Sequence, residues 1–386
     1  MCNNQINRIF AVMKMLYTML GAMMMCGCNT SATSANLSDA ICDSLANNES
    51  EPLSKEEMGD TLSFAFVGDV MMGTTFPDSV SGSHLPACDG RKLFDASKDV
   101  ISRVDLAGLN LEGSFLTGPG KRRPVTNPNT YYIFRMPPSY VTNLVTAGFD
   151  WVGIANNHIN DFGEPGREST MQTVRNAGLA VVGLKDRCET AQFIRKGRRI
   201  GVTQFGHGDN NLNVNSLEEL RRVVSALHEN NDIVVVSFHG GAEGKDKTRV
   251  PFAPEVYVGE KRGDVAAFAH AAIDAGADVV FGHGPHVPRG VELYRDRIIF
   301  YSLGNFCTPY RISKAGPCGY APIAEVFTDG AGRFLHGKVH SLLQRVGAGP
   351  IKDKKHSAAT LMRRMTELDF PTTNISIGAE GIITRH

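Results

Sequence analysis

Carboxylate, amide and imidazole side chains follow five apolar runs of this 386-residue chain, each at the point where the run ends. The five groups are Gly68-Asp69, Asn110-Leu111-Glu112-Gly113, Asn156-Asn157-His158, Ser237-Phe238-His239-Gly240-Gly241 and Gly282-His283-Gly284-Pro285-His286. Two carboxylates, an Asn carbonyl and four imidazoles suit divalent transition metals better than Ca²⁺ or a thiolate-bound structural zinc. A single strand-end Asp or His is usually an ordinary residue, but packing alone rarely produces five such groups. The sequence therefore predicts a metal site.

Alternating strands and helices must bring these groups together. Apolar runs predict strands over 62–67, 106–111, 151–155, 180–184, 199–204, 233–237, 279–282 and 298–303. Amphipathic segments predict helices over 91–104, 138–147, 166–177, 216–229 and 264–275, with Gly148, Gly178 and Gly276 as C-terminal stops. This alternation predicts a largely parallel sheet, with antiparallel strands added by hairpin-like stretches at 290–303 and 324–343. Because the carboxyl ends of parallel strands meet at one edge, the five groups are expected to converge there.

The composition limits the classes of function. Lys and Arg number 40 and Asp and Glu number 40, so the formal net charge is zero. Such a balance gives no electrostatic reason to expect nucleic acid as a partner. With 42% hydrophobic residues the chain can bury a large core, which excludes intrinsic disorder for the chain as a whole.

The N-terminus has the order of an export signal. Basic residues precede an apolar stretch over 15–27 that is too short to span a membrane, and the stretch ends before Cys28 in a segment similar to the bacterial lipobox. We interpret 1–28 as a lipoprotein-type signal segment, 29–60 as a flexible polar tether and 61–386 as the folded domain. The alternative is a cytoplasmic protein with an apolar N-terminus.

The eight cysteines include no CxxC pair. If Cys28 is lipidated, an odd number of cysteines remains, so they cannot all pair within the chain. Cys307 and Cys318 are close in sequence and are a candidate disulfide. Buried free thiols are the alternative.

The order of the motifs resembles that of a known family. FVGDVMMG, NLEGSF, ANNHINDFG, FHGGAE, GHGPHVPRGVE and YSLGNF, over about 62–306, are similar to the capsule synthesis protein CapA family, also named for poly-γ-glutamate biosynthesis. This family is a branch of the calcineurin-like metallophosphatase superfamily. The resemblance implies an α/β fold, a four-layer α/β/β/α sandwich, with two divalent metal ions (Mn, Fe or Zn) at one edge of the paired sheets.

Carried over position by position, the resemblance also implies the roles of individual residues. The implied ligands are Asp69 and His286 for the first metal, Glu112 as the bridge, and Asn157, His239 and His283 for the second metal. His158 would face the substrate as general acid, oriented by Asp161. Two neighbouring ions would activate a bridging water and neutralise charge on the attacked group.

Two positions depart from the superfamily pattern. Its first motif is Asp-x-His, whereas this chain has Asp69-Val70-Met71, and its second motif has a carboxylate of Asp where this chain has Glu112. A thioether is a poor ligand for a hard divalent ion, so the first metal is short of one ligand unless another residue, for which Glu243 is a candidate, replaces it. These departures weaken the inference of phosphatase activity.

Two further residues are candidates for substrate binding. Arg135, at the entrance to a predicted helix, is suited to clamp a carboxylate or phosphate, with a surface ion pair as the alternative. Asn305 follows the last predicted strand, where it would bind substrate or merely terminate the strand. The basic run 121–123 would recognise an anionic polymer, although a solvated loop explains it more simply. His207 and the remaining histidines are assigned no role.

Two classes of function follow. The first is a metal-dependent hydrolase acting on a phosphoester or on an amide bond of an anionic envelope polymer such as poly-γ-glutamate. The second is a non-catalytic accessory protein of capsule or polymer synthesis and export, associated with a polymer synthase complex. His158 beside Asn157 favours the enzyme, because a scaffold needs no acid there, whereas Met71 favours the accessory role.

We expect Cys28→Ser to release the protein from membranes, because the lipid attached to Cys28 would be the anchor that holds the folded domain at the envelope. Membrane fractionation followed by immunoblotting measures this. A variant that stays in the membrane fraction to the same extent as the wild type would contradict the lipobox interpretation.

Overall fold

The computed structural model describes residues 61–76, 84–124 and 132–386. The predicted signal segment (1–28) and tether (29–60) lie outside the described residues and stay predictions. Among the helices of the described part, none is both long enough and apolar enough to cross a membrane.

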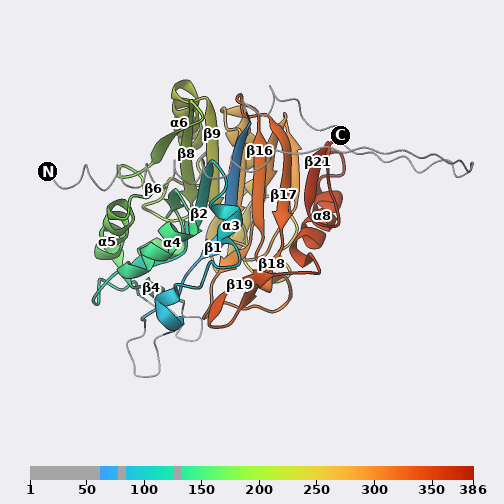
Figure 1. Cartoon of the computed structure of the whole chain (residues 1–386). Coiled ribbons are helices and arrows are strands. Elements are labelled where there is room, and N and C mark those ends of the chain that lie inside the picture. The colour runs from blue at the N-terminus through green and yellow to red at the C-terminus, as the bar shows by residue number, and fades with distance from the viewer. Residues whose placement is uncertain (1–60, 77–83, 125–131) are drawn as a thin grey trace, which may run out of the picture. The chain divides into compact units, whose positions relative to one another are not determined.

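Two β-sheets form the centre of the described structure (Figure 1). The larger sheet has nine strands: β20 (Ile375–Ile377), β21 (Ile382–Arg385), β17 (Phe334–His340), β16 (Ile323–Thr328), β1 (Leu62–Val70), β2 (Leu106–Leu111), β5 (Trp151–Gly153) and β6 (Ala180–Val182) in that order, with β15 (Asn305–Cys307) paired to β1. The pairs from β1 through β6 are parallel, and those from β1 through β20 are antiparallel. The prediction of a largely parallel sheet therefore holds for only one half of this sheet.

The second sheet has a parallel centre and antiparallel edges. Its six strands are β13 (Val291–Tyr294), β14 (Arg297–Phe300), β12 (Val279–His283), β9 (Ile233–His239), β8 (Arg198–Gly206) and β7 (Thr190–Arg195). Three two-stranded pairs lie outside both sheets: β3 (Ser114–Phe115) with β4 (Arg135–Met136), β10 (Glu255–Tyr257) with β11 (Glu260–Gly263), and β18 (Leu342–Arg345) with β19 (Ala348–Lys352). The predicted hairpins correspond to β13–β14 and β16–β17, which are antiparallel as expected.

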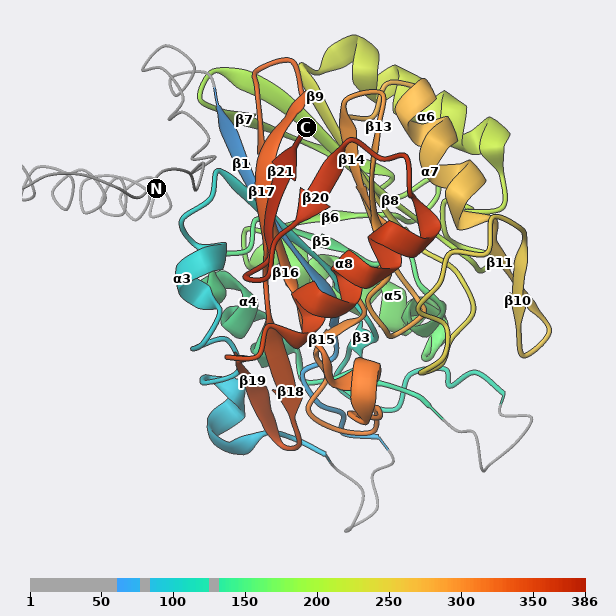
Figure 2. The same cartoon turned by 90° about the vertical axis from the view of Figure 1, so that its right-hand side faces the viewer.

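Helices cover the outer faces of the two sheets, as Figure 2 shows for α3 and α4 on one side and α6 and α7 on the other. The helices are α3 (Lys98–Ile101), α4 (Val141–Ala147), α5 (Gly163–Asn176), α6 (Leu217–Asn230), α7 (Val265–Asp274) and α8 (Ser357–Asp369). Along β1, Phe64 and Phe66 belong to the core between the sheets, where the Phe66 ring stacks on Phe281 at 4.2 Å. Ala65 and Val67 join the core beneath α3, α4 and α5, while α6 and α7 pack on the second sheet. The fold is thus a four-layer α/β/β/α sandwich.

The predicted helix stops agree with the structure, but one predicted helix is wrong. Gly148, Gly178 and Gly276 have positive φ angles of 95°, 82° and 108°, as residues just after helices commonly do. The helix predicted over 91–104 shrinks to α3. Its first half forms turns, in which the Ser97 hydroxyl donates to the carbonyl of the buried Phe94 and so competes with regular helical bonding.

The end of β1 is irregular, and this irregularity places Asp69. A register shift between Phe66 and Asp69 gives β1 one more residue than β2 over this stretch. The extra room is used by Gly68, where an added Cβ would lie 2.2 Å from the carbonyl oxygen of Gly304. That same carbonyl accepts a hydrogen bond of 2.9 Å from the Asp69 N–H. Any larger residue at position 68 would therefore push the chain before β15 away from Asp69.

The described cysteines, which include Cys307 and Cys318, are free thiols, so the predicted Cys307–Cys318 disulfide is wrong and the alternative of buried thiols is correct. Cys307 packs in the core between the larger sheet and helices α3, α4 and α5, and burial raises the pKa of its thiol to about 12. Cys318 lies on a separate 3-10 turn, Gly316–Gly319. Closeness in sequence did not bring the two sulfur atoms together.

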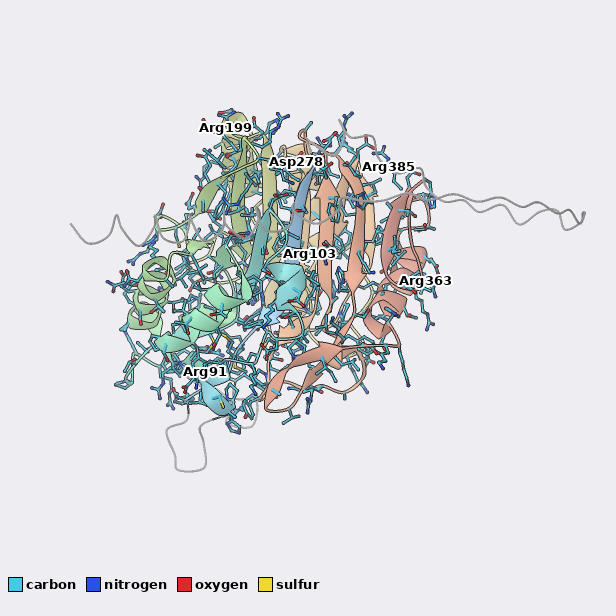
Figure 3. The ribbon with its side chains drawn as sticks, in the orientation of Figure 1. Arg91, Arg103, Arg199, Asp278, Arg363 and Arg385 are labelled. Carbon is cyan, nitrogen blue, oxygen red and sulfur yellow. The ribbon has the colours of Figure 1, made fainter. Side chains whose placement is uncertain are left out.

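The amino ends of the parallel strands are held by aspartates. Each of four aspartates that directly precede a parallel strand accepts a hydrogen bond from the second residue of the neighbouring strand: Asp105 from Ser63, Asp150 from Ala107, Asp232 from Arg199 and Asp278 from Val234. Figure 3 labels Arg199 and Asp278 at this end of the second sheet, opposite the carboxyl ends of the strands. These bonds fix the strand register far from the predicted metal site.

We expect the stability contributed by Asp278 to depend on pH. Burial raises its pKa to about 6, although Val234 and Arg297 favour the ionised form. Because the folded-state pKa lies above the value of the unfolded chain, this contribution is fully present below about pH 4 and is lost as the pH rises through 6. The free energy of unfolding of the wild type, measured by denaturant titration, should therefore fall relative to Asp278→Asn by roughly 2–3 kcal/mol between about pH 4 and pH 7.

Asp232→Asn is the matched control for this experiment. Asp232 makes the same kind of bond to the neighbouring strand, but its hydrogen bonds with Arg199 lower its pKa. Its contribution to stability is lost as the pH falls. The free energy of unfolding of the wild type relative to Asp232→Asn should therefore rise with pH, whereas relative to Asp278→Asn it should fall. Parallel pH profiles for the wild type and Asp278→Asn would contradict the assignment.

Candidate metal centre

The carboxyl ends of both sheets bring the predicted groups together. Asp69 lies near the end of β1, Glu112 follows β2, and His239 and His283 end β9 and β12, where the two histidines are direct register partners. Two groups lie on the following loops: His286, with a φ angle of 59°, after β12, and Asn157, at the start of the 3-10 turn Asn157–Asn160 after β5. A positive φ angle is uncommon for a residue other than glycine, and such strained positions cluster at functional sites.

The distances within this cluster are short. One ligand atom from each of Asp69, Glu112 and His239 lies within 4.8 Å of the others. The Asp69 carboxylate lies 3.1 Å from His283 Nδ1 and 2.9 Å from His286 Nδ1. His286 Nε2 is 3.6 Å from Glu112 Oε1. The structure thus gathers five of the six predicted ligands, and the sixth, Asn157, begins the turn that carries His158, whose Nε2 is 3.8 Å from Glu112 Oε1.

Several polar atoms of this cluster are buried and find no hydrogen-bond partner among the described residues. They are both carboxylate oxygens of Glu112, Asn157 Oδ1, His239 Nε2 and His283 Nε2. A buried polar atom without a partner is costly, because it has lost water and gained nothing in exchange. Oxygen and imidazole nitrogen are the donors that Mn, Fe and Zn accept. The residues present therefore fit a metal ion.

The charges in the cluster depend on one another. Burial opposes ionisation of Asp69, but hydrogen bonds with His283 and His286 hold its pKa well below the usual range. Burial, reinforced by the charge of Asp69, raises the pKa of Glu112 well above its usual value. Burial disfavours the charged form of His286, yet Glu112, Glu243 and Asp69 raise its pKa well above the usual range. The cluster thus attracts positive charge, which a metal ion would supply.

A His–Asp pair stands beside the cluster. The Nδ1 atom of His158 lies 2.9 Å from Asp161 Oδ2, so an Nδ1–H donor leaves Nε2 facing Glu112. Asp161 also accepts hydrogen bonds from the Phe134 N–H at 2.8 Å and from Arg123 Nε at 2.7 Å. The Phe134 ring packs on the His158 ring with centroids 4.5 Å apart. The imidazole is therefore held in one orientation on two sides.

The two residues predicted to bind substrate are both engaged with the protein. Asn305 Oδ1 lies 3.0 Å from His286 Nδ1, and its amide nitrogen donates to the His286 carbonyl, so Asn305 orients His286. Arg135 is buried, donates to the Gly118 carbonyl at 2.6 Å and to the Thr75 hydroxyl at 2.8 Å, and lines a pocket of about 400 Å³. Substrate binding by Arg135 or Asn305 stays a prediction.

Residues to which the sequence assigned no role of their own also contact the cluster. The Asn110 amide nitrogen donates to Asp69 at 2.8 Å, and its oxygen accepts from Gln204 at 3.0 Å. His207 is buried, with its ring 5.4 Å from that of His239. It directly follows β8, which ends at Gly206, whereas the predicted strand ended at residue 204. With the correct strand end, His207 would have been a candidate like the other polar residues that follow strands. Arg123, by its bond to Asp161, is likewise more than part of a solvated loop.

Comparisons with known proteins agree with the motifs. A family model described as "Bacterial capsule synthesis protein PGA_cap" matches residues 63–310. "Capsule biosynthesis protein CapA" of Bacillus anthracis is 27% identical over 270 residues, which cover 65% of this chain and 61% of that protein. A "Probable polyglutamine synthesis accessory protein" of Mycobacterium tuberculosis (strain ATCC 25618 / H37Rv) is 29% identical over 242 residues, which cover 54% of this chain and 56% of that protein. This chain thus spans less than two thirds of each of these relatives.

The calcineurin-like phosphoesterase YfkN from Bacillus subtilis aligns with a TM-score of 0.41 and 11% sequence identity, covering 80% of this chain and 97% of that chain.

We expect Mn²⁺ or Zn²⁺ to stabilise the wild type and to lose this effect in Glu112→Ala, because the variant lacks the buried carboxylate that faces the Nε2 atoms of both His286 and His158. An ion present at a hundredfold excess over its Kd adds about 2.7 kcal/mol to the free energy of unfolding. Thermal and denaturant unfolding with and without EDTA measure the increment. Glu325→Gln alters a buried carboxylate elsewhere, on β16, and should keep the increment. An equal increment in Glu112→Ala and wild type would contradict the site.

Proposed function

The chain belongs to the PGA_cap family of bacterial capsule synthesis proteins, and on this premise we propose that it is a metal-dependent hydrolase of the cell envelope. The observation that carries the proposal is the position of His158. Its Nε2 atom faces Glu112 at 3.8 Å, and the Glu112 oxygens find no hydrogen-bond partner among the described residues. A metal-binding cluster with a held imidazole at its edge is the arrangement that hydrolysis requires.

Six residues would hold two divalent ions in this proposal. They are Asp69 and His286 at the first position, Glu112 as the bridge, and Asn157, His239 and His283 at the second. When bound, such ions supply a nucleophilic water at neutral pH and neutralise charge on the attacked group. Asn110 and Asn305 would orient Asp69 and His286 by the hydrogen bonds described above.

His158 would move the proton. Asp161 binds Nδ1, so Nε2 is the atom that donates to the leaving oxygen or nitrogen. The three hydrogen bonds that Asp161 accepts, from His158, Arg123 and the Phe134 N–H, fix the orientation of its carboxylate. The Phe134 ring on His158 would limit the access of bulk water to the imidazole.

The substrate we propose is an anionic envelope polymer, such as poly-γ-glutamate, or a phosphoester. The names of the relatives refer to capsule biosynthesis and to polyglutamine synthesis. The basic run 121–123 reaches the site through Arg123, whose guanidinium lies next to Asp161, the partner of His158. Attachment to the membrane through Cys28 and association with a polymer synthase complex belong to the same proposal.

A second candidate function is a non-catalytic accessory role in polymer synthesis or export. Met71 favours it, because the superfamily has a metal-binding imidazole at that position. The Mycobacterium tuberculosis relative carries the word "accessory" in its name.

His158→Ala separates the two functions. As a proton donor that is not a metal ligand, His158 should be dispensable for metal binding, while turnover should fall by roughly 10²–10⁴. Metal content by mass spectrometry and hydrolysis of a generic phosphodiester and of γ-linked glutamate oligomers measure these effects. His336→Ala, on β17 and away from the cluster, is the control and should keep both metal and turnover.

The accessory function predicts a different outcome. An accessory protein has no turnover to lose, and polymer export in cells should survive His158→Ala. If the metal-loaded His158→Ala protein supports hydrolysis or polymer production as well as the wild type does, the enzyme proposal is wrong.

A further inference from the structure

We propose that Glu243 is an additional ligand of the first metal position and that Arg262 holds it there. Glu243 would take the place of the superfamily's histidine, which is Met71 in this chain. The inference rests on the proposed function, because it concerns the same metal centre. Glu243 lies on the loop after β9, four residues beyond His239, outside the six predicted ligands.

The distances around His286 place Glu243 at the cluster. His286 Nε2 lies 3.6 Å from Glu243 Oε2 and 3.6 Å from Glu112 Oε1. Two donor atoms bound to one ion at about 2.1 Å each are at most about 4.2 Å apart. Both separations are therefore short enough for Glu243 and Glu112 each to share one ion with His286.

The second oxygen of Glu243 is already anchored. Glu243 Oε1 lies 2.9 Å from Nη1 of Arg262, whose other terminal nitrogen lies 3.0 Å from Glu260 Oε2. Arg262 is only 3% exposed, and its carbonyl accepts a hydrogen bond from the Gly241 N–H on the Glu243 loop. The hairpin of β10 and β11, which projects beside α7 in Figure 2, thus fixes one edge of the carboxylate and leaves Oε2 directed at His286.

The donor chemistry explains why such a ligand is needed. Met71 is fully buried, but a thioether is a poor ligand for a hard divalent ion. Asp69, Glu112 and His286 alone would leave the first ion with three protein ligands. Glu243 adds a hard oxygen, and its charge brings three carboxylates against two divalent ions, which lowers the net positive charge of the buried centre.

Metal binding by matched variants tests the inference. Purified full-length protein is stripped with EDTA and titrated with Mn²⁺, and the stoichiometry and affinity are measured by calorimetry and by mass spectrometry of the dialysed protein. We expect two ions per chain in the wild type and a loss of affinity of at least about tenfold for one of them in Glu243→Ala. Glu260→Ala removes the other carboxylate that pairs with Arg262 and should bind both ions within about twofold of the wild type.

A spectroscopic readout distinguishes a ligand from a remote charge. With Co²⁺ in place of Mn²⁺, the visible absorption of the bound ion reports its coordination number, and we expect the spectrum to change in Glu243→Ala and not in Glu260→Ala. Glu243→Gln keeps the size and shape of the side chain beside Arg262, so it tests the loss of the charge without removing the side chain. It should fold as the wild type does and still bind the affected ion less tightly.

The outcomes separate this inference from the proposed function. Two ions bound with unchanged affinity and an unchanged cobalt spectrum in Glu243→Ala would overturn the inference alone. Equal losses in Glu243→Ala and Glu260→Ala would also overturn it, because they would show a general effect of charge around Arg262. A wild type that binds no ion would overturn both.

Discussion

Two carboxylates, Asp69 and Glu112, are buried completely at the ends of adjacent parallel strands, and the rest of the site depends on this constraint. Burial of two like charges costs several kcal/mol per ion unless positive charge and hydrogen bonds compensate for it. Asp69 receives a hydrogen bond from Asn110 and contacts from two histidines, whereas the Glu112 carboxylate accepts no hydrogen bond from the described residues. The centre therefore favours a bound cation. The same carboxylate charges raise the pKa of His286, because a protonated imidazole also compensates for them.

The scaffold concentrates its structural support at the opposite end of the strands. The aspartates before β2, β5, β9 and β12 fix the register by bonds to neighbouring strands, and aromatic packing of Phe66 on Phe281 joins the two sheets between the ends. Because those contacts hold the strands in place, the carboxyl ends are free to carry polar groups that add no stability by themselves. The bulge at Gly68 then determines where Asp69 lies relative to the neighbouring strands.

Two arginines from outside the two large sheets, Arg123 on a loop and Arg262 on β11, perform the same task on either side of the cluster. Arg123 binds Asp161, which holds His158, and Arg262 binds Glu243, which faces His286. A guanidinium fixes the orientation of a carboxylate because its donors are planar and always charged. Strand ends and the turns after them thus provide the inner residues of the site, and residues from outside the two large sheets help to orient them.

The sequence by itself determined the types of the inner residues and their place at strand ends, because apolar periodicity and the glycine helix stops at positions 148, 178 and 276 are local properties of the chain. Only the tertiary structure decided what depends on residues far apart in sequence. It divided the strands into two sheets, added β20 and β21 to the larger one, left Cys307 and Cys318 apart, and brought Arg123, His207 and Arg262 to the cluster. The physical reason is that strand pairing and the compensation of buried charge depend on residues far apart in the sequence. The residues next to a strand or a buried charge therefore do not reveal which distant residue will pair with it.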